Sequence, residues 1–149
     1  MVVIGLMIGV SGRAEIRMDR VEYRDGAATL EGLAVYDDAK SGPRPGVVVV
    51  HQWRGLGDYE RKRAEMLAQL GYVAFCADIY GKGVRAQTVE EAGKLAGQYK
   101  GDRALLRSRV RAALGQLKAL PQCDPARTAA LPTTKKRARS PRRSAFRCW

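Results

Sequence analysis

The hydrophobic pattern of the chain centres on four consecutive valines at 47–50, which end at a polar turn that contains glycine. A short and wholly apolar run is typical of a strand that is buried on both faces of a sheet. A second apolar run covers 72–77, and the residues between the two runs have helical spacing. Strand, helix and strand within about thirty residues predict a parallel βαβ unit with a right-handed crossover.

Two more strands are predicted ahead of this unit. Residues 17–24 and 28–36 carry apolar residues in near alternation, and the Asp25-Gly26 pair between them is a common turn sequence. We therefore expect an antiparallel hairpin, followed by a polar loop over 37–45 that contains glycine and proline.

The helix after the four valines is predicted from its end signals. Asp58 is expected to cap it, because the carboxylate can accept the free N–H groups of the first turn. The helical spacing continues to about Leu70, and Gly71 follows at the position that favours glycine.

Two further helices are predicted after the second apolar run. A Thr88-x-x-Glu91 capping box indicates the start of a short helix over 89–98. Asp102 is expected to cap a longer helix with a regular apolar stripe, and Pro121 is expected to end it.

Residues 127–131 begin like a third parallel strand, but the sequence changes character directly after them. Seven Lys or Arg lie between 131 and 149 with no acidic residue, and subtracting them from the net charge of +12 leaves +5 for residues 1–130. Such a segment cannot bury enough apolar surface to order itself, so we expect a disordered basic tail over 131–149. Its composition is what an off-frame reading of a GC-rich gene gives. We interpret it as the product of a frameshift near Leu131; the alternative is a genuine C-terminus with a basic function.

Residues 1–14 resemble a secretory signal. Residues 1–10 are apolar or glycine, and the small residues Gly12 and Ala14 are placed like a cleavage site, although a positive first region is missing. The run is too short to span a bilayer, so no integral membrane association is expected. A genuine signal predicts a periplasmic or secreted protein; a merely frayed apolar end predicts a cytoplasmic one.

Neither the cysteines nor the histidine form a metal-ligand pattern. Cys76, Cys123 and Cys148 have no Cys-x-x-Cys spacing, and His51 is the only histidine. We therefore expect no metal and no cofactor. Cys76 lies in an apolar run and is expected in the core, whereas Cys123 lies in a turn that lacks the glycines of a nucleophile elbow.

Three stretches resemble the dienelactone hydrolase family of α/β-hydrolases. They are Pro45-Gly-Val-Val-Val-Val-His-Gln-Trp-Arg-Gly-Leu-Gly-Asp-Tyr59, Leu70-Gly-Tyr-Val-Ala-Phe-Cys-Ala-Asp-Ile-Tyr-Gly-Lys-Gly83 and Asp124-Pro-Ala-Arg127. The resemblance covers roughly residues 21–130. It implies an α/β fold with an incomplete α/β-hydrolase-type sheet, made of the hairpin and parallel βαβ units. Residues 15–130 would form this domain.

The resemblance also implies site residues. The backbone N–H of Trp53 would be one donor of the oxyanion hole, and Gln52 occupies a place that is often acidic in the family. Lys82 lies near the position at which family members carry an arginine that binds the substrate carboxylate. A lysine at such a place is more often a plain solvated charge. The family's nucleophile elbow, Gly-x-Cys/Ser-x-Gly, should follow the strand at 127–131, but Pro132-Thr-Thr-Lys-Lys stands there, and no later acid or histidine follows.

Simpler structural roles remain open for the residues of this loop. Trp53 can equally pack over the edge of the sheet. His51 is expected to be a structural histidine that is hydrogen-bonded within the loop, because no acid or nucleophile follows Asp124 to partner it.

The sequence therefore predicts a hydrolase of ester or lactone bonds, present as a truncated fragment that lacks the nucleophile elbow, acid and histidine and has little or no activity of its own. Its partner would be a small-molecule ester or lactone, and no specific nucleic acid is expected. The alternative is a non-catalytic module whose basic tail binds nucleic acid or anionic membrane. A third possibility is a chain too incomplete to fold stably.

Overall fold

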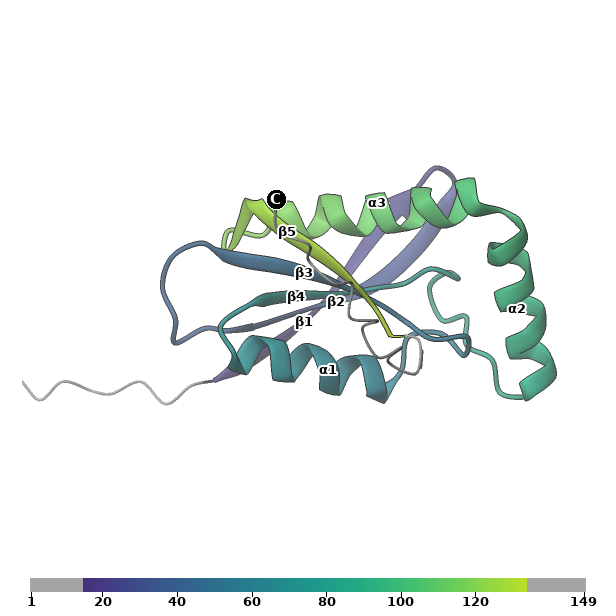
Figure 1. Ribbon diagram of the computed structural model, residues 1–149, viewed down its shortest axis with the longest axis horizontal. Coiled ribbons are helices and arrows are strands. Elements are labelled where there is room, and N and C mark those ends of the chain that lie inside the picture. Colours follow the sequence, from purple (N-terminus) through teal and green to yellow (C-terminus); the bar gives the residue numbers. More distant parts are fainter. Residues whose placement is uncertain (1–14, 134–149) are drawn as a thin grey trace, which may run out of the picture.

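The computed structural model describes residues 15–133 and contains a five-stranded sheet with α3 on one face and α1 on the other (Figure 1). The elements in chain order are β1 (Ile16–Asp25), β2 (Ala28–Asp37), β3 (Arg44–Val50), α1 (Asp58–Gln69), β4 (Val73–Ala77), α2 (Val89–Gly101), α3 (Arg103–Ala119) and β5 (Cys123–Pro132). The strand order is β1-β2-β4-β3-β5, in which β3 is parallel to both β4 and β5. The predicted fold class, a hairpin joined to parallel βαβ units, is confirmed.

The central strand β3 has apolar side chains on both faces because helices cover both faces. Val48 packs with Phe75 and Leu117 on the side of α3, whereas Val49 packs with Ala64 on the side of α1. Val48 and Val49 are fully buried. Each such side chain contributes about 1.5–3 kcal/mol relative to full exposure, which explains why this run of valines specifies the centre of the fold.

The hairpin of β1 and β2 is anchored to the rest of the domain by polar contacts. Arg109 of α3 forms a 2.9 Å ion pair with Asp25 at the end of β1, and both side chains are largely buried. The hydroxyl of Tyr23 donates to the Asp78 carbonyl over 3.1 Å. These contacts compensate for a short β2–β4 pairing, which covers only Leu33 to Val35.

The start of α1 differs from the prediction. Gly57, not Asp58, is the N-cap residue, and its N–H donates to Oε2 of Glu60 over 3.0 Å. Asp58 is the first helical residue and pairs with Arg61 at the surface. A carboxylate three residues into the helix can reach back to the N-cap N–H, and that reach replaces the cap predicted for Asp58.

The other predicted caps are confirmed, but α2 continues to Gly101, past the end predicted at residue 98. Gly71 has a φ of +94°, a left-handed conformation in which glycine ends the helix without strain. The Thr88 hydroxyl accepts from the Glu91 N–H over 3.1 Å. Asp102 accepts from the Leu105 N–H over 2.9 Å, so one residue ends α2 and caps α3.

The last strand, β5, is longer than predicted at both ends. It begins at Cys123, and a register shift opposite Pro45 and Gly46 accommodates the expected Asp124-Pro125 turn. It continues through Pro132, and the Thr133 N–H donates to the Val50 carbonyl over 3.0 Å. Residues 131–133 thus belong to the ordered domain, because their backbone forms hydrogen bonds with β3.

The signal-like segment at 1–14 and the tail from residue 134, with Cys148, lie outside the described residues. Between residues 15 and 133, no helix combines the length and apolar character needed to cross a membrane.

Candidate active site

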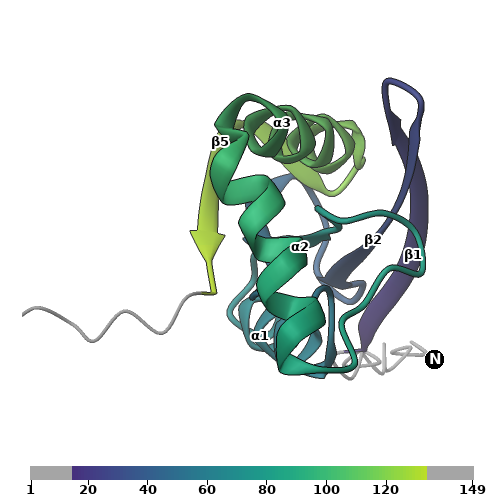
Figure 2. The ribbon, with the colours of Figure 1, turned by 90° about the vertical axis from the view of Figure 1, so that its right-hand side faces the viewer.

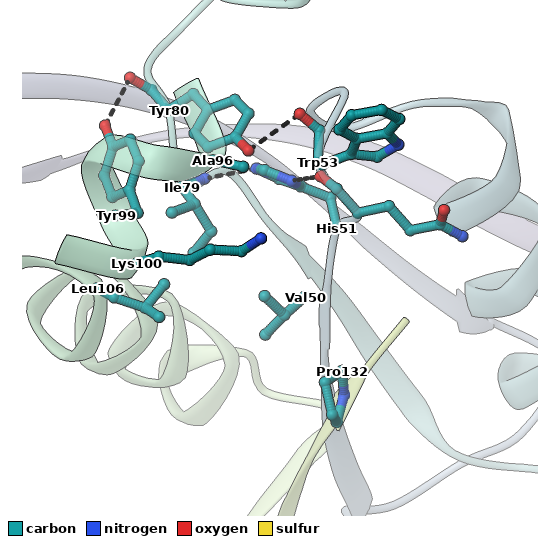
Figure 3. Close-up of a pocket in the computed structure, with 11 residues that line it drawn as sticks. Val50, His51, Trp53, Ile79, Tyr80, Ala96, Tyr99, Lys100, Leu106 and Pro132 are labelled. Carbon is teal, nitrogen blue, oxygen red and sulfur yellow. Dashed lines mark hydrogen bonds between the residues drawn. The ribbon is translucent and has the colours of Figure 1, made fainter. Parts of the chain in front are cut away.

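A cavity of about 390 Å³ lies at the carboxyl ends of the parallel strands. Its lining residues follow β3 and β4, end β5, and project from α2 and α3 (Figure 3). Open α/β sheets bind their ligands at this edge, because the loops that leave the strands converge there. The Gln52-Trp53 loop singled out from the sequence forms one wall of the cavity.

The buried carboxylate of Glu60 holds this loop. Its Oε1 accepts from the Gln52 N–H over 3.2 Å, while its Oε2 accepts from the Gly57 N–H over 3.0 Å. The same Oε1 lies 3.2 Å from the Thr133 hydroxyl, at the end of β5. One side chain of α1 therefore fixes both ends of the loop and the chain that leaves the neighbouring strand.

Tyrosines fix the loop from the cavity side. The Tyr80 hydroxyl donates to the Trp53 carbonyl over 3.0 Å, and the Tyr99 hydroxyl donates to the Tyr80 carbonyl over 3.3 Å (Figure 3). Asp78 shapes the turn that carries Tyr80, since its Oδ1 accepts the N–H groups of Tyr80 and Gly81. A tyrosine hydroxyl is protonated and can donate at neutral pH, and partial burial raises the pKa of Tyr80 further.

His51 is a buried structural residue, as the sequence analysis favoured. Its Nε2 accepts the Ile79 N–H over 3.2 Å, so the proton lies on Nδ1, which donates to the Gln52 carbonyl over 2.6 Å. Burial lowers the pKa of His51, and both ring nitrogens are occupied in the neutral form. His51 thus joins the loops after β3 and β4 and has no nitrogen left for proton transfer.

The backbone of Trp53 is fixed by a hydrogen bond, whereas its side chain is partly exposed to solvent. The Tyr80 hydroxyl donates to the Trp53 carbonyl, the residue as a whole is 44% exposed, and the indole extends away from Lys100 and Val50 (Figure 3). Within residues 15–133, the backbone N–H of Trp53 has no hydrogen-bond acceptor. Both roles considered for Trp53, a backbone donor of the oxyanion hole and a side chain packed over the sheet edge, stay predictions.

The surroundings of Lys82 differ from those of Lys100, a residue that the sequence analysis did not single out. Lys82 is ion-paired with Glu22 of β1 and does not line the cavity. Lys100 of α2 lines the cavity and extends between Ile79 and Leu106 (Figure 3). In the described part of the chain, no carboxylate lies within ion-pair distance of Lys100.

The described cysteines are not placed for catalysis. Burial raises the pKa of Cys76 to about 12, and its thiol faces the backbone of α1. Cys123 is buried at the start of β5, the strand end opposite the cavity, next to Gly46. Within residues 15–133, no group of three His, Cys, Asp or Glu side chains could hold a metal ion.

Sequence reasoning missed Glu60, Tyr80 and Lys100 as site residues. Glu60 could have been found, because a Gly-x-x-Glu spacing at 57–60 permits half of a capping box. Lys100 carried no such signal, since its position depends on how α2 packs beside the strand ends.

Comparison with known proteins identifies the family. The model of the dienelactone hydrolase family matches residues 30–131. The chain is 39% identical, with a TM-score of 0.75, to a dienelactone hydrolase-like promiscuous phosphotriesterase from metagenomic libraries, covering 80% of this chain and 49% of that one. It is 38% identical to the structure named m3DLH, with a TM-score of 0.76 over 78% of this chain and 49% of that one.

A dienelactone hydrolase from Anabaena variabilis ATCC 29413 shares the fold at 21% identity, with a TM-score of 0.56 over 78% of this chain and 51% of that one. A search of curated protein sequences gave no match. The chain spans about half the length of these solved structures. On the family match and on these two relatives near 40% identity, the chain belongs to the dienelactone hydrolase family.

Proposed function

We propose that this chain supplies the oxyanion-loop half of an ester or lactone hydrolase. The observation that carries the proposal is the Gln52-Trp53 loop, which is fixed by Glu60 and Tyr80 beside a cavity and keeps the Trp53 N–H without a partner among residues 15–133. A fixed N–H donor stabilises the charge that develops on a carbonyl oxygen during attack. Family membership supports the same reaction class.

The proposed chemistry is nucleophilic catalysis. A cysteine or serine adds to the substrate carbonyl, the alcohol leaves with a proton, and water then hydrolyses the acyl-enzyme. The 149 residues contain no Gly-x-Cys/Ser-x-Gly sequence. We therefore expect the chain by itself to have little or no turnover.

A direct assay tests this expectation. The purified chain is incubated with a p-nitrophenyl ester and with an aryl phosphotriester, the second chosen because a 39% identical relative is a phosphotriesterase. Release of nitrophenol should equal that of a heat-unfolded sample. Turnover that His51→Ala or Cys123→Ala abolishes would contradict the proposal.

Lys100, and not Lys82, is the proposed contact for an anionic group of the substrate. Lys100 lines the cavity, whereas Lys82 is paired with Glu22. Titration of the chain with an aromatic carboxylate should show binding that Lys100→Met weakens and Lys82→Met leaves unchanged. The reverse pattern would restore the role predicted from the sequence.

The frameshift near Leu131 also remains a proposal. It is supported by the change from an apolar strand to a basic, aperiodic sequence at the place where the elbow is expected. Reading the nucleotides after the Leu131 codon in all three frames tests it. An elbow sequence in another frame is the expected result, and its absence from all frames would refute the idea.

A further inference from the structure

A second hollow lies between α1 and the β1–β2 hairpin. β1 and β5 form opposite edges of the sheet (Figure 2), and this hollow lies towards the β1 edge. Three arginines from separate parts of the chain line it: Arg20 of β1, Arg61 of α1 and Arg85 of the segment between β4 and α2. We call this hollow the arginine groove. It shares no lining residue with the cavity beside the Gln52-Trp53 loop.

The positive charge of the arginine groove is poorly neutralised. Among the described residues that line it, Glu31 of β2 is the only acidic one, so three positive charges face one negative charge. Glu31 lies 3.4 Å from Arg20, whose side chain is 74% exposed. Arg61 lies 3.6 Å from Asp58, whose side chain is 95% exposed. Solvent screens both pairs, and Arg85 forms no ion pair within residues 15–133.

The backbone around Arg85 is fixed on two sides. The Ala86 N–H donates to the Arg54 carbonyl over 3.1 Å, which joins the segment that carries Arg85 to the loop before α1. Lys82 pairs with Glu22, which holds the same segment beside β1. A binding site whose backbone is fixed in advance loses less conformational entropy when its ligand arrives.

The floor of the arginine groove is apolar. Leu33 of β2 and Leu56 both line the groove and pack against the core cluster that contains Val49 and Ala64. Because an apolar floor lowers the local dielectric constant, it strengthens the attraction between the guanidinium groups and an anion. The groove has a volume of about 30 Å³, room for about two water molecules, so it fits a small anionic group rather than a whole substrate.

A phosphate group matches this charge and size. Guanidinium groups bind phosphate and carboxylate oxygens through paired, charge-assisted hydrogen bonds. A phosphomonoester carries a charge of about −1.5 to −2 at pH 7, which balances the excess positive charge of the groove better than a carboxylate does. Its several oxygens can also accept from donors that approach from different directions.

We propose that the arginine groove binds a phosphate group, either inorganic phosphate or the phosphate end of a small phosphomonoester. Arg20, Arg61 and Arg85 donate to the phosphate oxygens, and Glu31 competes with the anion for Arg20. This binding goes beyond the proposed hydrolase function and does not depend on it.

Nuclear magnetic resonance titration of the full chain tests the proposal. The ¹⁵N-labelled chain is titrated with inorganic phosphate and, separately, with phenyl phosphate at constant pH and ionic strength. The amide signals of Leu56, Gly57 and Arg85 should shift and saturate with a Kd below about 1 mM for at least one probe. Saturation by inorganic phosphate supports recognition of the free anion, whereas saturation by phenyl phosphate alone supports recognition of the ester.

Matched substitutions separate the groove from the general positive charge of the chain. Arg61→Gln and Arg85→Gln should each raise the Kd by about fivefold or more, because each removes a charge-assisted hydrogen bond. Lys62→Gln is the control, since it removes the same charge from α1 outside the groove and should change the Kd less than about twofold. Glu31→Gln should lower the Kd by about twofold or more, because it removes the carboxylate beside Arg20. Circular dichroism of each variant verifies that the chain has kept its fold.

Three results would overturn the inference. The first is the absence of saturable shifts with either probe up to about 10 mM. The second is equal weakening by Arg61→Gln and Lys62→Gln, which would indicate diffuse attraction to a chain with a net charge of +12. The third is weaker binding by Glu31→Gln. Phosphate binding that passes these tests in a chain without ester turnover would support the groove independently of the hydrolase proposal.

Discussion

The carboxylate of Glu60 gives the sharpest test of how the candidate site is held together. Glu60→Ala removes the acceptor of the Gln52 N–H and of the Gly57 N–H, which lie 3.2 and 3.0 Å from the carboxylate oxygens. It also removes a negative charge from the first turn of α1.

The size of the effect follows from these losses. A buried N–H left without a partner costs about 1–3 kcal/mol. Gln52 and Gly57 are only partly buried, so the lower half of that range applies to each, and the charge at the helix start adds about 0.5 kcal/mol. We expect Glu60→Ala to lower the free energy of unfolding by about 2.5–4.5 kcal/mol, and Glu60→Gln, which keeps one acceptor oxygen, by about half as much.

Urea unfolding followed by circular dichroism measures this difference. With a urea dependence of about 2 kcal/mol/M, the midpoint should fall by about 1–2 M. Glu65→Ala is the matched control on the same helix, because the Glu65 carboxylate forms no hydrogen bond or ion pair within residues 15–133. A Glu60→Ala midpoint equal to that of Glu65→Ala would refute the reasoning, as would unchanged hydrogen exchange at Gln52 and Gly57.

Three further predictions concern the polar contacts around the site. The pKa of His51 is lowered by burial, so the unfolded chain binds more protons below about pH 6.5 and stability should fall as the pH drops from 7 towards the folded pKa; unfolding midpoints between pH 5 and 8 should show this slope, and His51→Gln should lack it. Tyr80→Phe removes the donor to the Trp53 carbonyl and should cost about 0.5–1.5 kcal/mol in urea unfolding, whereas an unchanged midpoint would show that the bond is not formed in solution. Arg109→Met leaves the Asp25 carboxylate without its buried partner and should cost about 3–5 kcal/mol in the same assay, and a loss below 1 kcal/mol would contradict the buried pair.

The parts of the fold that sequence analysis predicted are those that depend on local chemistry. The Thr88–Glu91 box acts between neighbouring residues, and the run of valines in β3 indicates burial on both faces whatever its distant packing partners are, so both patterns can be recognised in the sequence. Asp58 shows the limit of this reasoning. Two carboxylates compete for the free N–H groups at the start of α1, and the reach of Glu60 decides the outcome.

The parts of the site that escaped prediction depend on packing between distant elements. Lys82 follows β4 as expected, but its partner Glu22 lies on β1, a strand with no local link to it. Lys100 reaches the cavity because α2 packs beside the strand ends. No spacing rule connects such residues, since the tertiary arrangement alone determines which charged group faces the ligand.

The position of β5 beside β3 has a consequence for synthesis on the ribosome. Arg44 pairs with Cys123, so this contact closes a long loop, whereas the turn of the β1–β2 hairpin joins neighbouring residues. Local pairs form in microseconds, and long-range pairs form later. Until β5 has emerged, the apolar edge of β3 is bare in the nascent chain, and it is during this interval that a chaperone would bind it.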